Sequence, residues 1–265
     1  ERAPKDLKHD WDRAFCSGVN RPFNVTTSSS PAEYGLPGIV NKAGNDLSPN
    51  VTWWEQSRDY IQYINRCCYM LQQGLFVADV LYYNGDDVPN FVYLKEDYAA
   101  LNFGYDWDKC SRDVILNRAS VSDGKILLPD GMSYKVLVLA PEKAINADVL
   151  RKVEKLVLGG AIVVAPRPER ATGLGGYPES DKEVAEIARR MWGDPDGKTI
   201  TKRRYGKGQV RWGENINDIL KSLDVQPDFS FRSCADSTAL DYIHRTMTNQ
   251  DIYFVVNRFA HHGIN

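Results

Sequence analysis

The sequence predicts an α/β fold, and two features of the chain support that assignment. First, apolar runs suited to buried strands alternate with amphipathic helices from Leu75 to about residue 235. The clearest strands are 76–83, 134–140 and 161–165, which are dense in Val, Leu, Ile or Tyr. Second, the strand–helix–strand order of the last two implies parallel strands joined by a right-handed crossover.

The composition excludes some classes of protein. The chain has 265 residues, of which 43% are hydrophobic and 11% aromatic, enough to bury a core. Its 33 basic and 35 acidic residues leave a formal net charge of −2, so no field of one sign favours nucleic acid. No apolar stretch approaches the roughly 20 residues that span a bilayer. The 5 cysteines form no C-x-x-C pair, and no metal site is predicted.

The opening segment is loop-rich. A short amphipathic helix is expected from Leu7 to Phe15, and residues 22–51 then carry Pro, Gly, Ser, Thr and Asn without periodicity. A loop of this length in a compact domain is usually functional or disordered. We favour an ordered loop that forms a site, because it contains four large apolar side chains suited to burial: Phe23, Tyr34, Leu36 and Ile39.

A helix is predicted from Thr52 to about Gln73. Thr52 and Glu55 fit a capping box at its start, and Gly74 fits a left-handed C-cap at its end. Trp53 and Trp54 are adjacent, so only one of them can face the core. The other is a candidate platform for a sugar ring, unless both pack at the domain boundary.

Further elements are predicted along the chain. A helix is expected at about 107–116, and a hairpin with a turn at Asp123-Gly124 follows it. The remaining expected elements are helices at 147–158, 180–192 and 214–223, a second hairpin at 199–212, and antiparallel strands at 240–245 and 251–257.

Open parallel sheets bind ligands outside the carboxyl ends of their strands. That edge is expected to contain Gly85–Asp87, Pro166–Arg167 and Gly173–Gly176. No phosphate-binding glycine pattern occurs there, so no nucleotide cofactor is predicted. No Cys or Ser occupies a tight turn after a strand, so an amidotransferase-like shape would lack its nucleophile. Turns that close a structural domain are therefore the favoured interpretation.

Six linked segments carry a resemblance to a known family. They read LKHDWDRAFCSGVNR, SSSPAEYGLPG, AGNDLSPNVTWW, YINRCCYMLQQGLFVADVLYYNGDD, SVSDGKILLPDGMSYKVLVLAP and IHRTMTNQDIYFVVNR. In this order they resemble glycoside hydrolase family 106, the α-L-rhamnosidases. The family pattern is rich in His at residues 22–31 and 44–46, where this chain has none.

The resemblance implies an architecture and a function. Residues 1–73 would be the C-terminal part of an incomplete (β/α)8 barrel, and 74–235 a non-catalytic, flavodoxin-like domain of the class I glutamine-amidotransferase type. Residues 236–265 would begin a β-sandwich module. A rhamnose-containing polysaccharide is the implied substrate, and the implied location is periplasmic or extracellular. The residues nearest the sugar would be Asn20, Arg21, Asn24, Trp53 and Trp54, on the active-site face.

The resemblance also implies that the catalytic carboxylates lie upstream of Leu7. The chain alone is therefore predicted to be an inactive part of a glycosidase, with no catalytic residue assigned. An incomplete barrel would leave apolar surface uncovered, which predicts possible self-association. Two alternatives stay open at this point. One is a non-catalytic structural or carbohydrate-binding protein, and the other is a nucleotide-binding flavodoxin-like module.

Overall fold

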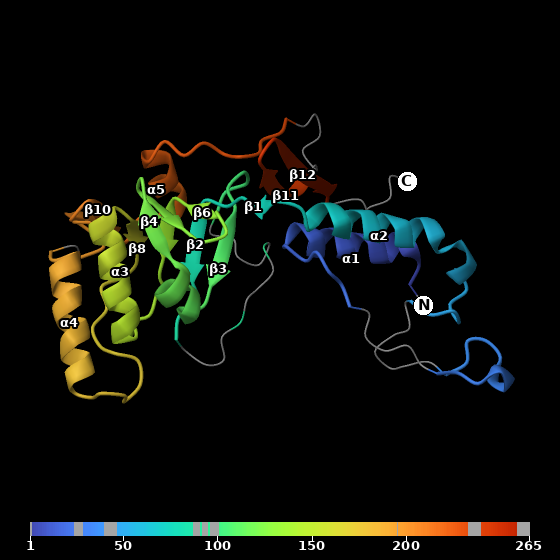
Figure 1. Cartoon of the computed structure of the whole chain (residues 1–265), viewed down its shortest axis with the longest axis horizontal. Coiled ribbons are helices and arrows are strands. Elements are labelled where there is room, and N and C mark those ends of the chain that lie inside the picture. Colours follow the sequence, from blue (N-terminus) through green and yellow to red (C-terminus); the bar gives the residue numbers. More distant parts are fainter. Residues whose placement is uncertain are drawn as a thin grey trace. The chain divides into compact units, whose positions relative to one another are not determined.

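The chain forms two compact units in the computed structural model, which describes residues 2–23, 29–39, 47–86, 91, 95, 101–194, 196–232 and 240–258. Residues 1–76 and 233–265 make up the N-terminal unit, and residues 77–232 make up the α/β unit (Figure 1). The sequence divided the chain into three parts, at residues 73 and 235. In the structure the closing strands instead group with the opening residues.

The N-terminal unit packs two helices on a small sheet. Helices α1 (Pro4–Cys16) and α2 (Arg58–Leu71) accompany strands β1 (Leu75–Phe76), β11 (Leu240–Met247) and β12 (Gln250–Asn257), in the order β1-β11-β12. Phe15 of α1, Leu71 of α2 and Ile243 of β11 are buried in one cluster. No strand lies in the described part of residues 1–73, so the last barrel strands expected there are not found in it.

The start of the predicted second helix was wrong. Residues Trp54–Gln56 form a separate 3-10 turn, η2, and α2 begins only at Arg58, with Ser57 at the N-cap position. Trp53 precedes η2, and two contacts fix its indole. Its Nε1 donates to the Arg2 carbonyl at 2.9 Å, and its ring packs edge-to-face on Tyr60. A second 3-10 turn, η1, spans Ala32–Tyr34.

The apolar run after α2 is two strands, each in a different sheet. β1 pairs with β11 in the N-terminal unit, whereas β2 (Val80–Tyr83) belongs to the α/β unit. Gly74 does adopt a left-handed conformation, with φ +60, as the sequence predicted. A Cβ on this residue would lie 2.3 Å from the Thr246 carbonyl oxygen. The glycine is thus needed for the close approach of β11 as well as for the turn.

The α/β unit contains a six-stranded sheet in the order β3-β2-β7-β8-β10-β9. All neighbours are parallel except the outermost strand β9, which is antiparallel to β10. Counted along the chain, the five parallel strands therefore lie in the spatial order 2-1-3-4-5. The strands other than β2 are β3 (Trp107–Cys110), β7 (Val136–Val138), β8 (Ile162–Val164), β9 (Lys202–Tyr205) and β10 (Gly208–Arg211).

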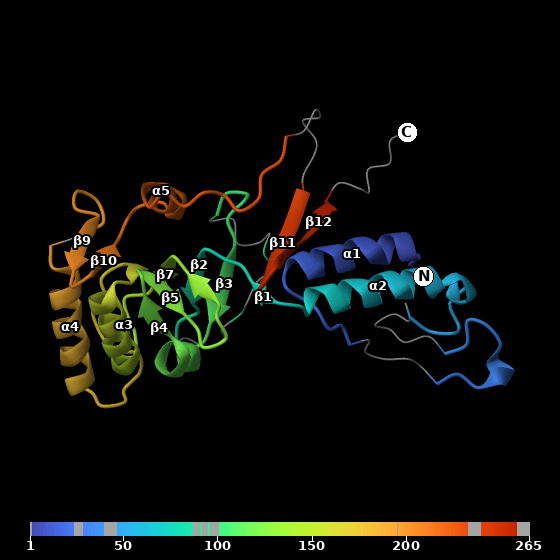
Figure 2. The same cartoon turned by 45° about the horizontal axis from the view of Figure 1, so that its top comes forward.

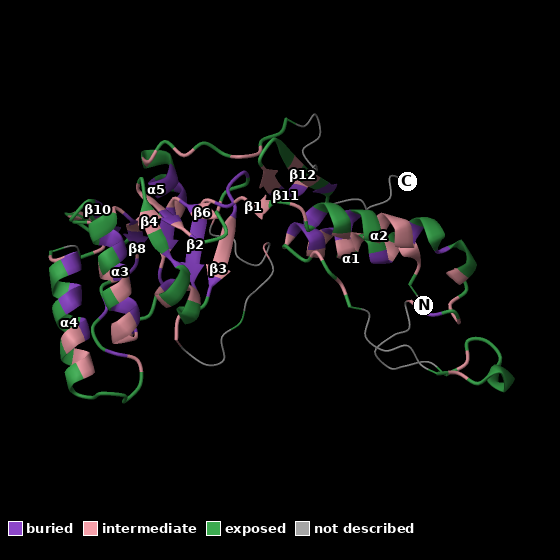
Figure 3. Ribbon diagram, viewed as in Figure 1, coloured by how far each residue is buried: buried purple, intermediate pink, exposed green. Residues whose placement is uncertain are grey.

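Helices cover both faces of this sheet. α3 (Ala147–Gly159) and α4 (Glu179–Trp192) lie on one side, and α5 (Ile216–Ser222) lies on the other (Figures 1 and 2). Val80, Val136 and Ile219 form the buried cluster under α5. Central strand residues pointing either way are buried, as Figure 3 shows, because both faces are covered. The helices predicted at 147–158, 180–192 and 214–223 are thereby confirmed.

The helix predicted at 107–116 was wrong. Its first half, Trp107–Cys110, forms the edge strand β3, and helical residues begin only at Arg112 and continue as the π-helix Val114–Arg118. The prediction rested on the helical spacing of Trp107, Cys110 and Val114. In the structure the segment 107–110 instead pairs in parallel with β2, and the Trp107 ring packs edge-to-face on Tyr82, which stabilises the strand. The hairpin that follows is confirmed as β4 (Ser120–Ser122) and β5 (Lys125–Leu127), which are joined by β6 (Ser133–Tyr134).

Candidate functional site

The turn that carries Asn20 and Arg21 is fixed by the end of α1. Gly18 has φ +95, its N–H donates to the Phe15 carbonyl, and the Val19 N–H donates to the Ala14 carbonyl, both at 3.0 Å. These bonds form the usual left-handed glycine end of a helix. The backbone therefore enters the Asn20 position in one defined direction.

Asn20 is bound to the C-terminal end of α2. Its side-chain amide donates to the Leu71 carbonyl at 3.4 Å, and its own carbonyl accepts from the Gln72 side chain at 2.8 Å. Arg21 beside it is exposed, and no described residue makes a hydrogen bond or ion pair with its guanidinium. Asn20 thus ties two helix ends together, while the Arg21 side chain extends into solvent.

The two tryptophans lie at the opposite end of α2. Trp53 is held by the Arg2 carbonyl and Tyr60, and Trp54 is half-buried at the start of η2. Because α2 has 14 residues at about 1.5 Å each, roughly 20 Å of helix separates this end from Asn20. The structure therefore does not bring the predicted sugar-contacting residues into one cluster. Asn24, the fifth of them, lies outside the described residues.

α1 and α2 run side by side in the same direction (Figure 1). The start of α1 contacts Trp53 before α2, and the segment after α1 contacts the end of α2. Midway, the buried Asp12 carboxylate of α1 pairs with Lys8 at 2.6 Å and accepts a hydrogen bond from the Tyr63 hydroxyl of α2. Burial and this bond raise the pKa of Tyr63. Asp12 thus holds the two helices together, and no pattern in the sequence predicted this cluster.

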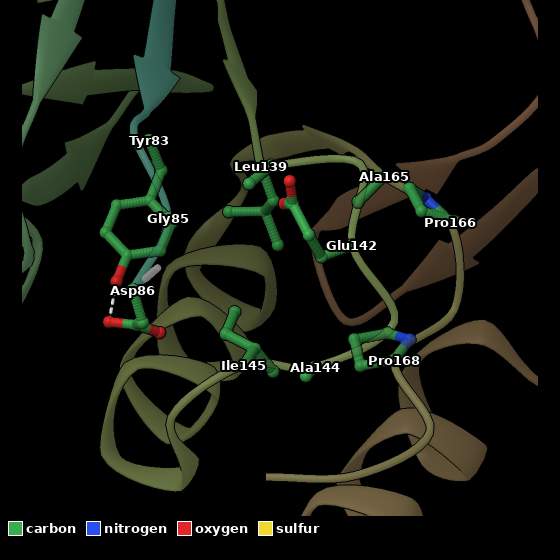
Figure 4. Close-up of a pocket in the computed structure, with 11 residues that line it drawn as sticks. Tyr83, Gly85, Asp86, Leu139, Glu142, Ala144, Ile145, Ala165, Pro166 and Pro168 are labelled. Atoms are coloured by element: carbon green, nitrogen blue, oxygen red, sulfur yellow. Dashed lines mark hydrogen bonds between the residues drawn. The ribbon is translucent and has the colours of Figure 1, made fainter. Parts of the chain in front are cut away.

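A small hollow lies at the carboxyl edge of the α/β sheet, where the sequence placed the ligand edge (Figure 4). It is formed by turns that follow β2, β7 and β8. The lining residues are Tyr83, Gly85, Asp86, Leu139, Ala140, Glu142, Ala144, Ile145, Ala165, Pro166 and Pro168. Two of them are carboxylates, and none is basic. This lining does not fit a phosphate group, which binds where cations or free backbone N–H groups converge.

The protein's own carboxylate occupies the polar end of this hollow. Asp86 accepts a hydrogen bond from the Tyr83 hydroxyl at 2.5 Å and another from the Asn146 N–H at 3.0 Å, just before α3. Burial and the bond to Asp86 raise the pKa of Tyr83. A carboxylate before a helix N-terminus takes the place that an anionic ligand would otherwise take. The Asp86 carboxylate therefore has a structural role in this turn. This agrees with the sequence analysis, which favoured structural turns over a ligand site at this edge.

Cys110 is the described cysteine at the carboxyl end of a strand in this sheet. It ends β3, is 6% exposed, and burial raises the pKa of its thiol to about 12. Reactive cysteines have a lowered pKa and some exposure, so this thiol has neither property of a nucleophile. Cys67 and Cys68 in α2 also have raised pKa values, again because of burial.

The described residues contain no group of three or more His, Cys, Asp and Glu side chains arranged for a metal ion. They also contain no helix long and apolar enough to cross a membrane.

Comparison with known sequences gives the family. The sequence model of glycoside hydrolase family 106, described as alpha-L-rhamnosidase, matches residues 1–263. The chain belongs to glycoside hydrolase family 106. The resemblance predicted from the six motif segments is thereby confirmed. The match extends over both units, so the α/β unit is as much part of the family sequence as the N-terminal unit.

Two similar proteins are much longer than this chain. It is 34% identical over 255 residues to a protein of Formosa agariphila named putative beta-glucuronidase, covering 96% of the chain and 20% of that protein. It is also similar to the solved structure of a rhamnosidase from Novosphingobium sp. PP1Y, with a TM-score of 0.83 and 32% identity. That match covers 97% of this chain and 24% of that protein. The chain thus spans about a quarter or less of each relative.

Proposed function

We propose that the chain is the end of the catalytic barrel and the following companion domain of a longer glycosidase, which releases α-L-rhamnose from a rhamnose-containing polysaccharide. The observation that carries this proposal is the family 106 match over residues 1–263 together with the likeness to a solved rhamnosidase. A polysaccharide substrate supports a periplasmic or extracellular location, because such a chain is degraded outside the cytoplasm.

The directions of α1 and α2 support the barrel part of this proposal. In a (β/α)8 barrel every helix follows its strand, so the helix N-termini point to the active-site face. Consecutive barrel helices run in the same direction, as α1 and α2 do. Trp53 and Trp54, which precede α2, would then lie toward the sugar. Asn20, which joins the C-terminal ends of the two helices, and the exposed Arg21 beside it would lie on the opposite face.

The α/β unit is proposed to be a flavodoxin-like companion without chemistry of its own. Its parallel strands have the 2-1-3-4-5 order of such folds. Asp86 occupies the polar end of the hollow at the carboxyl edge, and the buried Cys110 thiol has a raised pKa. These observations favour a structural unit over an amidotransferase or a nucleotide-binding module.

The catalytic carboxylates are proposed to lie outside residues 1–265. Glycosidases use two carboxyl groups roughly 5–9.5 Å apart. In the described part of residues 1–76, Asp12 is committed to Lys8 and Tyr63, and Glu55 is exposed on η2. The failure of the capping box leaves Glu55 without its expected structural role, so it needs a direct test.

A second substrate class has one specific observation in its favour. The Formosa agariphila relative is named a putative beta-glucuronidase. A uronic acid differs from rhamnose in carrying a carboxylate, so the two substrates require different contacts in the sugar site. We favour the rhamnoside, because both the family description and the solved relative name it.

Kinetics on the full-length parent protein test these proposals. We expect turnover of 4-nitrophenyl α-L-rhamnoside and a kcat/KM at least about tenfold lower for 4-nitrophenyl β-D-glucuronide. A higher kcat/KM for the glucuronide than for the rhamnoside would show that the parent is a β-glucuronidase. Glu55→Gln in the parent is expected to keep kcat within about threefold, whereas a loss of about 10³-fold or more would place a catalytic carboxylate inside this chain.

A further inference from the structure

A loop at the carboxyl edge of the sheet protrudes from the α/β unit. It connects β8 to α4 and contains Gly173–Gly176, one of the segments that the sequence placed at the ligand edge. The body of the unit holds the base of this loop. Arg170 forms a backbone bridge with Ala144, and the Ala171 N–H donates to the Asp181 carboxylate of α4 at 2.9 Å. The residues between this base and α4 therefore extend from a fixed support.

The protruding residues form a tight turn with an apolar side chain at each end. The Tyr177 N–H donates to the Leu174 carbonyl at 3.2 Å, and such a turn brings its two end Cα atoms within about 7 Å of each other. Leu174 is 83% exposed and Tyr177 is 62% exposed. Figure 3 shows this segment as exposed at the start of α4. We call residues 174–177 the apolar turn.

The backbone of the apolar turn is as open as its side chains. A Cβ added to Gly173 or Gly175 would meet no atom of the described chain within 4 Å. Single exposed apolar side chains are common on soluble proteins and need no partner. Leu174 and Tyr177 differ from that case, because one fixed turn presents both of them. They lie in a long loop, and long loops in compact domains are usually functional.

The size of the apolar turn indicates what kind of partner covers it. An aromatic side chain buries about 150–250 Å², and leucine is smaller. The two side chains together offer well under the roughly 800 Å² that each partner of a stable complex buries. A separate protein, or a second copy of this chain, would not stay bound to so small a surface alone. A partner in the same polypeptide would stay bound, because the covalent link holds it at a high effective concentration.

We infer that the apolar turn docks in an apolar pocket of the parent polypeptide outside residues 1–265. The inference rests on the proposed function in one respect, that the chain is part of a longer family 106 enzyme. The lengths of the relatives support this occupant, because the chain covers only 20% and 24% of them. The α/β unit would then help to hold another domain of the enzyme in place.

Hydrogen exchange on the parent and on the chain 1–265 tests the inference. The amides of residues 173–176 are expected to exchange at least about tenfold more slowly in the parent than in the chain alone. Equal exchange in the two proteins would overturn the inference. Protection that disappears on dilution of the parent would also overturn it, because the occupant would then be a second copy. Protection that requires added polysaccharide would overturn it as well, because the turn would then bind sugar.

A charge on the apolar turn provides a matched pair of variants. Leu174→Lys is expected to speed exchange of residues 173–176 at least about tenfold in the parent. In the chain alone it should change exchange less than about threefold, because the side chain is 83% exposed there. Ile200→Lys, at an isoleucine that is 45% exposed in the same unit, is the control and should leave residues 173–176 unchanged in both proteins. An equal effect of Leu174→Lys in both proteins would contradict the docking.

The rhamnoside assay separates this inference from the proposed function. A parent that hydrolyses the rhamnoside but leaves the apolar turn unprotected would overturn the docking alone. A parent that protects the apolar turn but hydrolyses no glycoside would overturn the proposed function and keep the docking.

Discussion

The Tyr63 hydroxyl of α2 donates a hydrogen bond to the buried Asp12 carboxylate of α1. Lys8, one turn before Asp12, pairs with the same carboxylate, and its ammonium lies 4.4 Å from the centre of the Tyr63 ring. Two side chains, Lys8 of α1 and Tyr63 of α2, thus satisfy one buried charge. A buried charge that loses a partner is costly, so this cluster fixes how the two helices pack.

Tyr63→Phe is expected to destabilise the N-terminal unit by about 1–3 kcal/mol, because it leaves the Asp12 carboxylate one donor short in a desolvated site. Urea unfolding, followed by hydrogen exchange of α1 and α2, measures the change. Tyr69→Phe is the matched control on the same helix, where the side chain is 67% exposed, and should cost less than about 0.5 kcal/mol. Equal effects of the two variants would show that the bond contributes nothing.

Asp79, before β2, makes the stability of the α/β unit depend on pH. Its pKa is raised from 3.8 to about 6, mainly by burial and also by the nearby Asp228, while a backbone N–H of Asp106 and the Lys135 ammonium oppose the rise. A raised folded-state pKa means that the folded protein binds the proton more tightly than the unfolded chain. Below about pH 4 the carboxyl is protonated in both states and does not lower the free energy of unfolding. As the pH rises from about 4 to about 6, ionisation of Asp79 lowers the free energy of unfolding by a growing amount.

Asp79→Asn is accordingly expected to stabilise the α/β unit by about 1–3 kcal/mol at pH 7.5 and by almost nothing at pH 3.5. Asparagine keeps an oxygen for the Asp106 N–H, which bonds the carboxylate at 3.4 Å. Urea unfolding at the two pH values measures the difference. The same stabilisation at both values would contradict the ionisation argument.

The Cys110 thiol is expected to resist modification in the folded protein. With its pKa at about 12 and 6% exposure, it should react with iodoacetamide at pH 8 at least about 100-fold more slowly than after unfolding. Peptide mapping by mass spectrometry identifies the labelled cysteine, and the half-buried Cys68 serves as the internal comparison. Rapid labelling of Cys110 in the folded protein would contradict this prediction and would make Cys110 a candidate nucleophile of the α/β unit.

The two ends of α2 are expected to contribute differently to activity in the parent. Trp54→Ala should raise KM for the rhamnoside roughly tenfold with little change in kcat, because a contact made equally in ground and transition states is lost. Arg21→Ala, on the opposite face in the proposed barrel, should leave both constants within about twofold. A larger effect of Arg21 than of Trp54 would contradict the proposed direction of the helices.

Hydrophobic periodicity predicted most of the α/β unit. α3 was predicted correctly because its apolar positions repeat with helical spacing and all five are buried: Val149, Leu150, Val153, Leu156 and Val157. The run 75–83 shows the limit of such patterns. Its residues are equally apolar throughout, so nothing in it indicates that β1 and β2 join different sheets. That division depends on β11, which lies more than 150 residues later in the sequence.

The site was less predictable than the fold. Trp53 and Trp54 are both half-buried, whereas their adjacency suggested that only one of them could face the core. The capping box failed, because α2 begins only at Arg58 and Trp53 contacts the Arg2 carbonyl and Tyr60. Asn20 was predicted beside the sugar, yet its partners are Leu71 and Gln72. Such long-range hydrogen bonds leave no pattern in a single sequence. The family motifs identify the protein class without indicating which end of α2 faces the substrate.

The most direct measurement compares hydrolysis of 4-nitrophenyl α-L-rhamnoside by the chain 1–265 and by the full-length parent at equal concentrations. We expect turnover by the parent and a rate for the chain alone no different from buffer, because the catalytic carboxylates are proposed to lie outside it. Turnover by residues 1–265 alone, abolished by Glu55→Gln, would contradict the account and place the chemistry in the N-terminal unit.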